Sequence, residues 1–128
     1  MVFYETEITA LGGECAEFVA ANMLVLFGEG APAELRDISA IHTVRVMAAE
    51  PILETGRVLE IGHHALRIVA VGTVAEDNLR SIGHLVIVKG GEDPILPGQI
   101  RVEGSWPSPG EVQIGRTVVV RDWTSKGS

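Results

Sequence analysis

Eight short segments rich in β-branched and other apolar residues, separated by Gly and Pro, run through this chain from end to end. Runs of this length bounded by turn-forming residues are typical of β-strands. We expect strands at Val2–Thr9, Asn22–Phe27, Ile41–Met47, Val58–Ile61, Ala65–Val71, His84–Val88, Ile100–Val102 and Arg116–Val120. Strands at such intervals favour a sheet closed on itself. The sequence therefore predicts an all-β fold, a small closed or partly open β-barrel with short covering helices, and leaves a sandwich as the alternative.

The hydrophobic pattern differs between these strands and indicates how each is buried. In the first strand Tyr4, Thr6 and Ile8 alternate with a row that contains acidic residues, so we expect one face to be half exposed. The runs MLVLF (23–27) and RTVVVR (116–121) are almost continuously apolar. We expect both of these strands to be buried on both faces.

Three segments break the strand pattern and predict short helices. Glu14–Ala21 contains helix formers with apolar residues three and four apart. Pro32 stands at the start of a second segment of one or two turns. Thr73 and Glu76 match a capping box at the start of a third helix, which Gly83 would end. Such short helices are unstable alone, so we expect them to cover the sheet.

Length and composition are those of one ordinary globular domain. The chain has 128 residues, of which 46% are apolar and 21% charged. A chain of this size and mix buries a real core and rarely divides into two. We expect a single barrel domain over residues 1–122, followed by a polar C-terminal tail over residues 123–128.

The charge balance and the single cysteine limit the partners and the cellular compartment that we expect for this protein. Seventeen acidic and ten basic residues give a net charge of −7, which repels nucleic acid and anionic lipid, so we expect no nucleic-acid partner. The start lacks the pattern of a signal sequence, and no apolar stretch approaches about 20 residues, so we expect no direct membrane insertion.

Cys15 cannot form an internal disulfide, which predicts a reducing, cytoplasmic location. We interpret Cys15 as a small buried hydrophobe.

Histidine is the side chain most able to carry chemistry in this chain. His42 projects from an otherwise apolar row of its predicted strand. It is either a core residue satisfied by hydrogen bonds, which is the commoner case, or a functional group. His84, at the start of another predicted strand, leaves the same two interpretations open.

No cofactor is expected from the spacing of these residues. His63 and His64 are adjacent, so their side chains diverge, and a zinc site would need His42, His64 and His84 to be brought together by the fold. The segment GEGAP (28–32) lacks the Lys-Ser/Thr continuation of a phosphate-binding loop and is interpreted as a turn. We expect neither a metal nor a nucleotide.

Three blocks of sequence are more specific than composition: MLVLFGEGAPAELRDISAIH (23–42), VLEIGHHALRIVAVGTVAEDNLRSIGHLVI (58–87) and LPGQIRVEG (96–104). They contain Phe27 followed by Glu-Gly-Ala-Pro at 29–32, the Ile41-His42 pair, Ala-Val-Gly at 70–72, Val-Ala-Glu-Asp-Asn-Leu at 74–79, and Ile82-Gly83-His84. In this order, the motifs resemble the IIA component of the glucitol/sorbitol-specific phosphotransferase system. The resemblance covers residues 2–120.

The resemblance implies a small, mostly β protein that accepts a phosphoryl group from the histidine-containing carrier protein HPr. It implies transfer of that group to a cysteine on the IIB component of a membrane permease, which also has a IIC component. By the same resemblance His42 is the phosphorylated residue, and His84 orients or stabilises the phosphorylated ring. His64 also falls on a family histidine, with no role assigned. Donor and acceptor are then protein side chains, so no cofactor is needed.

The chemistry of this task suits a histidine that partners can reach. An imidazole with an ordinary pKa near 6.5 is mostly neutral at pH 7, so a nucleophilic nitrogen is available. Phosphoryl transfer then needs in-line positioning and donors for the spread charge. We expect His42 to lie near solvent with room for a tetrahedral anion, because two partners must reach the same nitrogen. A ring sealed in the interior, with both nitrogens bonded to protein, would argue against the carrier function.

Two further expectations concern function and assembly. Thr43, Val44 and Arg45 depart from the family pattern after the Ile-His pair, which leaves a non-catalytic regulatory or polyol-sensing module as the alternative function. Unpaired edge strands in so small a sheet would permit a homodimer.

Overall fold

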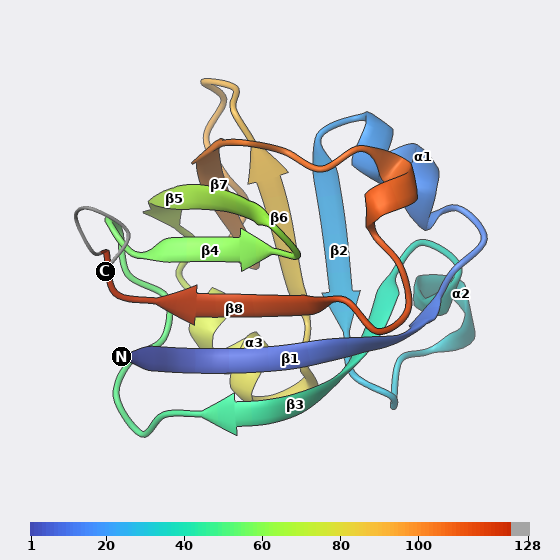
Figure 1. Ribbon diagram of the computed structural model, residues 1–128, viewed down its shortest axis with the longest axis horizontal. Helices are drawn as coiled ribbons and strands as arrows, with labels where there is room; N and C mark the ends of the chain where they lie inside the picture. Colours follow the sequence, from blue (N-terminus) through green and yellow to red (C-terminus); the bar gives the residue numbers. More distant parts are fainter. Residues whose placement is uncertain (124–128) are drawn as a thin grey trace.

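Eight strands close into a barrel in the computed structural model, which describes residues 1–123 (Figure 1). The strands are β1 (Val2–Leu11), β2 (Met23–Phe27), β3 (Ala40–Met47), β4 (Val58–Ile61), β5 (His64–Val71), β6 (Leu85–Lys89), β7 (Gln99–Gly104) and β8 (Thr117–Arg121). Around the barrel they follow the order β1-β3-β2-β6-β7-β5-β4-β8. The prediction of a mostly β, closed barrel is confirmed. The predicted tail from residue 124 onward lies outside the described residues.

All eight predicted strands are present, and their ends differ from the prediction by at most two residues. The differences follow from pairing, which the sequence pattern does not contain. β1, for example, continues to Leu11 because Leu11 pairs with Ala40 at the start of β3. Figure 1 shows β1 between β3 and β8, with which it forms antiparallel ladders.

Two strand pairs are parallel, and they determine where the connections run. β2 pairs in parallel with β3, and β6 with β7. Parallel neighbours need a crossover connection instead of a hairpin. The connection from β2 to β3 carries α2 (Ala33–Arg36), and it brings the end of β2 beside the start of β3, with Phe27 opposite Ile41.

The three predicted helices form, as α1 (Cys15–Ala20), α2 (Ala33–Arg36) and α3 (Ala75–Ile82). The expected capping box on α3 is wrong: no side chain caps this helix, and Val74 occupies the position before it. Glu76 instead accepts hydrogen bonds from the backbone N–H groups of Ile52 and Leu53 and pairs with Arg80. The Glu76 carboxylate, which would have completed the capping box, therefore binds the backbone N–H groups of a neighbouring loop. No helix within residues 1–123 is both long and apolar enough to cross a membrane.

A capping box does form elsewhere, at a short 3₁₀ turn that the sequence analysis left as loop. The turn η1 (Pro109–Glu111) follows Ser108, whose backbone N–H and hydroxyl both bond to the Glu111 carboxylate. The loop before it is attached to α1, because the Trp106 indole N–H donates to the Val19 carbonyl at 2.9 Å.

The interior is filled by the inward rows of the strands, and Cys15 is buried among them, as predicted. β2 is also buried on its outer side, where Phe27 packs in a second small cluster with Ala31 and Ile41. The same prediction is wrong for β8, in which buried Val118 and Val120 alternate with partly exposed residues. A helix packs on the outside of β2, whereas no helix packs substantially on β8.

A tight backbone contact at the end of β1 gives a test of the packing. A Cβ on Gly12 would stand 2.0 Å from the Arg36 carbonyl oxygen and 2.3 Å from that of Asp37, so Gly12→Ala must push two backbone segments apart. We expect it to lower the free energy of unfolding by about 1–3 kcal/mol. The matched control is Gly13→Ala, because no atom lies within 4 Å of a Cβ there. Chemical denaturation of both variants measures the difference, and equal stabilities would contradict the packing described.

Candidate functional site

Three segments distant in sequence meet beside the start of β3: the end of β2, the first residues of β3 and the turn between α3 and β6. Gly83 ends α3 in the left-handed conformation, with φ +70°, which glycine adopts without strain. The Gly28 N–H donates to the Ile82 carbonyl at 3.0 Å and holds this turn against the end of β2. The first residues of β3, Ala40 and His42, face inward beneath the contact.

His42 is 2% exposed, and both of its ring nitrogens are hydrogen-bonded. Nε2 lies 2.7 Å from the Gly83 carbonyl oxygen, and Nδ1 lies 2.5 Å from the Thr6 hydroxyl oxygen. A carbonyl can only accept, so Nε2 carries the proton and donates it. In the neutral ring Nδ1 then accepts the Thr6 hydroxyl proton, which defines the tautomer.

The surroundings keep this ring neutral. Burial lowers the pKa of His42 from its ordinary value of 6.5, and the hydrogen bond to Gly83 acts in the opposite direction. The aromatic ring of Tyr4 meets the imidazole edge to face, with centroids 6.5 Å apart. Burial raises the pKa of Tyr4 to about 12 against the opposite effect of a hydrogen bond with Thr6, so its hydroxyl stays protonated.

The expectation that His42 lies near solvent is wrong in this conformation. The strand pattern placed His42 on one face of β3 correctly, together with Ala40, but that face is the barrel interior at this point. The cover comes from the turn at Gly83, 41 residues later in the chain. A Cβ on Gly83 would lie 3.1 Å from His42 Nε2 and 2.9 Å from Gly28 N, so one layer of glycine backbone closes the site.

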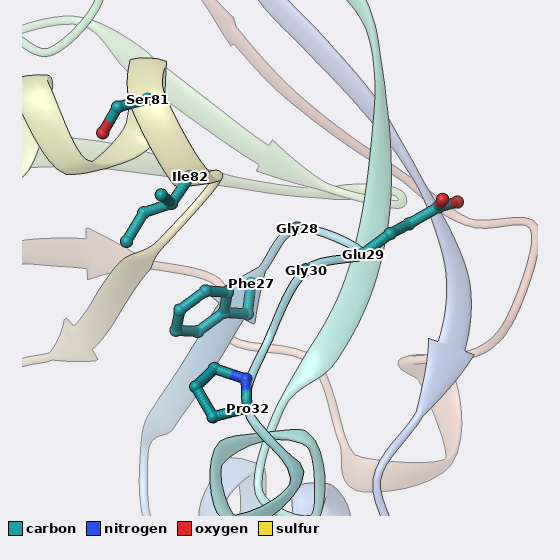
Figure 2. Close-up of a pocket in the computed structure, with 7 residues that line it drawn as sticks. All are labelled: Phe27, Gly28, Glu29, Gly30, Pro32, Ser81 and Ile82. Carbon is teal, nitrogen blue, oxygen red and sulfur yellow. The ribbon is translucent and has the colours of Figure 1, made fainter.

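A cavity of about 520 Å³ lies on the outer side of this glycine layer. Its walls come from the end of β2 with the following turn and from the end of α3: Phe27, Gly28, Glu29, Gly30, Pro32, Ser81 and Ile82. Figure 2 shows the side chains of Phe27, Pro32 and Ile82 grouped together, whereas Glu29 points away from them. Gly28 and Ile82 line the cavity and also hold the Gly83 turn, whose carbonyl oxygen accepts the hydrogen bond from His42 Nε2.

His84 lies at the same junction and is half-buried. Its ring stacks on Phe27, with centroids 4.5 Å apart and planes inclined by 30°. Nδ1 donates to the Leu26 carbonyl at 3.2 Å, so in the neutral ring Nε2 carries the lone pair. No hydrogen bond to this Nε2 is found within residues 1–123. The structure therefore brings both histidines to the Gly83 turn: His42 bonds to the Gly83 carbonyl, and His84 is the next residue of the chain.

The other two histidines lie elsewhere on the barrel. His63 is exposed, and His64 bonds through Nδ1 to Ser105 at 2.6 Å and through Nε2 to Glu111 at 2.9 Å. Hydrogen bonds from His64 and Ser108 lower the pKa of Glu111 to about 2. In the part of the chain that the structure describes, no three His, Cys, Asp or Glu side chains are grouped to hold a metal ion.

Thr6, Gly28 and the cavity wall are the parts of the site that the sequence analysis missed. Thr6 was expected in the buried row of its strand, but nothing in the sequence pairs it with His42, which lies 36 residues away on another strand. The glycines were interpreted as a turn and a helix end. Their role as the cover of a histidine is visible only when β2, β3 and the α3–β6 turn are placed together.

The barrel has the fold of a PTS system IIA component. The chain superimposes on the crystal structure of a PTS system IIA component from Enterococcus faecalis V583 with a TM-score of 0.68, covering 89% of this chain and 96% of that one at 24% identity. A sequence model described as the PTS system glucitol/sorbitol-specific IIA component matches residues 3–119. The chain belongs to this family, as the sequence motifs indicated.

Two curated relatives are similar over most of their length. They are the PTS system glucitol/sorbitol-specific EIIA components of Shigella flexneri and of Escherichia coli (strain K12). Each is 36% identical over 115 residues, covering 87% of this chain and 92% of the relative. The matched region contains His42, His64 and His84 together with the glycine turn.

The state of His42 gives a pH prediction. As the pH falls through about 6.5, the unfolded chain protonates this histidine before the folded protein does, because burial lowers the folded-state pKa. Stability from this group is present above that pH and is lost below it, by at most about 1.4 kcal/mol per pH unit. His42→Gln, which does not titrate, should weaken this pH dependence in denaturation experiments between about pH 5 and 8.

The matched control is His63→Gln, an exposed histidine that should leave the pH dependence unchanged. ¹⁵N NMR of the His42 ring provides the second measurement. It should find the proton on Nε2 at pH 7. A charged His42 ring at this pH, or a proton on Nδ1, would contradict the tautomer assigned from the hydrogen bonds.

Proposed function

We propose that this protein is a phosphoryl carrier of a glucitol/sorbitol-type phosphotransferase system. It accepts the group from phospho-HPr on a histidine and passes it to a cysteine of the IIB component, which works with the membrane permease component IIC. The observation that carries the proposal is family membership over residues 3–119, together with relatives described as glucitol/sorbitol-specific EIIA components. The protein works in the cytoplasm, where HPr is available.

His42 is the proposed acceptor. It stands in the Ile-His motif within the matched region, its ring is neutral, and its Nε2 bonds to a turn that borders a cavity of about 520 Å³ through Ile82. The closed conformation cannot accept a phosphoryl group, because Nε2 is covered by Gly83. The function therefore requires the α3–β6 turn to open when a partner docks.

His84 is the proposed positioning residue on the other side of that turn. The His84 ring packs on Phe27, which lines the cavity. When the Gly83 turn moves, this contact can keep the ring beside the cavity while the backbone of His84 changes position. Its Nε2 also makes it the competing acceptor, since this nitrogen needs no uncovering. If His42 is the acceptor, substitution of His42 abolishes phosphorylation. If His84 is the acceptor, substitution of His84 abolishes it.

The partner surface is the mouth of the cavity. Ile82, in the cavity wall next to the Gly83 turn, is 49% exposed. A small apolar contact of this kind suits a transient complex that must release its partner. The net charge of −7 favours approach of a carrier through a basic patch.

A regulatory or polyol-sensing module is the second candidate function. The observation that favours it is the closed ring of His42, which meets the condition stated above as an argument against a carrier. Such a module would keep the fold and dock partners at the same cavity without taking up a phosphoryl group.

Phosphorylation by phosphoenolpyruvate, enzyme I and HPr distinguishes these possibilities. We expect the wild-type chain to gain the mass of one phosphoryl group in acid-labile form, and His42→Gln to gain none. His84→Gln should fold and take up the group at least about tenfold more slowly, because the ring beside the turn is no longer positioned. His63→Gln is the control with the wild-type rate.

Each other outcome has a definite meaning. Full labelling of His42→Gln with loss of label in His84→Gln would move the acceptor to His84. A wild-type chain that stays unlabelled, while a known IIA protein is labelled in the same mixture, would favour the regulatory module. Calorimetric titration with glucitol would then test for polyol binding.

A further inference from the structure

We propose that, when the His42 ring accepts a phosphoryl group, its hydrogen bond to the Gly83 carbonyl is replaced by a contact between that group and the His84 N–H, its hydrogen bond with Thr6 reverses direction, and the Gly83–His84 peptide is the moving part. This inference rests on the proposed function with His42 as the acceptor. In the closed state Nε2 donates to the Gly83 carbonyl and Nδ1 accepts from Thr6. In the phosphorylated state the His84 N–H faces the phosphoryl group, and the Thr6 hydroxyl accepts from Nδ1.

The position of the two nitrogens selects Nε2 as the atom that is phosphorylated. Nδ1 points to Thr6, which is fully buried in the barrel. Nε2 points to the Gly83 turn, and Gly28 of the cavity wall holds this turn through its hydrogen bond to the Ile82 carbonyl. Moving one layer of backbone therefore exposes Nε2, whereas exposing Nδ1 would require opening the core between β1 and β3.

A turn of the peptide plane changes the chemistry at Nε2. The Gly83 carbonyl oxygen, 2.7 Å from Nε2, would repel a phosphoryl group because both are acceptors. Turning the peptide plane over replaces this oxygen with the His84 N–H, a donor of the kind that stabilises a spread negative charge. The His84 N–H gives up only a 3.2 Å hydrogen bond to the Asn78 carbonyl, which is at the long end of the normal range.

Glycine is required at position 83 in both states. The closed state has φ +70° and ψ +17°, and the turned peptide keeps a positive φ with an extended ψ, a region that glycine alone adopts readily. A side chain would also stand 2.9 Å from Gly28 N and 3.1 Å from His42 Nε2. The residue that ends α3 therefore also allows the turn to change state.

The transfer step balances without a further reactant. While the turn is open, the side chain rotates away from Thr6, the proton on Nε2 leaves to solvent and a proton from solvent binds Nδ1, which converts the ring to the other neutral tautomer before it returns to Thr6. The Nε2 lone pair forms a bond to phosphorus, and the bond between phosphorus and the HPr imidazole breaks with its electron pair on that ring. Nδ1–H then donates to the Thr6 oxygen, since a hydroxyl can accept as well as donate.

NMR of the full-length protein labelled with ¹³C and ¹⁵N, before and after phosphorylation by HPr, tests the inference. We expect phosphorus on His42 Nε2, a proton on Nδ1, and a correlation between the ³¹P nucleus and the His84 amide. The Gly83 carbonyl signal should shift as it loses its donor. The matched reporter is the Gly72 carbonyl, which accepts from Ala75 N at the other end of α3 and should stay unchanged.

The result that overturns the inference is separable from failure of the carrier function. If mass and ³¹P spectra place the group on His42 while the Gly83 carbonyl and His84 amide keep their original signals, the peptide does not turn, although the carrier function stands. If no phosphoryl group reaches His42, the inference and the acceptor assignment are both wrong, and the mass measurement identifies that case.

A pair of substitutions at Thr6 tests the second part of the proposal, that the Thr6 hydroxyl accepts a hydrogen bond from Nδ1–H of the phosphorylated ring. Thr6→Val keeps the side-chain shape but leaves Nδ1–H without an acceptor, so we expect uptake to slow roughly tenfold to hundredfold. Thr6→Ser keeps the hydroxyl and should take up the group near the wild-type rate. A folded Thr6→Val protein with unchanged uptake would show that Thr6 does not accept from Nδ1.

Discussion

The hydrogen bond from His42 Nε2 to the Gly83 carbonyl is the contact on which the candidate site depends. It joins the start of β3 to the turn between α3 and β6, two segments that share no strand ladder. Because the carbonyl can only accept, this contact determines the tautomer of the ring, and the burial that accompanies it lowers the pKa of His42. One backbone oxygen thus determines which ring nitrogen carries the proton and how the imidazole is oriented.

A closed resting site is compatible with a carrier whose intermediate is unstable in water. In the proposed carrier a phosphorylated imidazole must survive between two encounters, and a turn that closes again over the site would exclude the water that hydrolyses it. The cover needs to be removable, which glycine backbone at Gly28 and Gly83 permits because neither residue brings a side chain into the contact. The cavity outside the cover gives a docking partner a place from which to displace it.

Much of the fold could be predicted from the sequence, because strand and helix formation depends on local patterns. All eight strands and three helices were placed within two residues, and the motifs around Ile41-His42 indicated the family. The errors concern tertiary contacts. Glu76 was expected to cap α3 but binds the loop at Ile52, and β8 was expected to be buried on both faces but has an outer face on which no helix of residues 1–123 packs substantially.

The sequence alone determined the secondary structure, the family and the candidate histidines, because each of these is written in residues close together along the chain. Only the tertiary structure decided whether His42 is open or covered. Its two hydrogen-bond partners, Thr6 and Gly83, lie 36 and 41 residues away and reach it through strand pairing around a closed barrel. No local pattern encodes such an environment, since it arises when segments distant in sequence pack against one another.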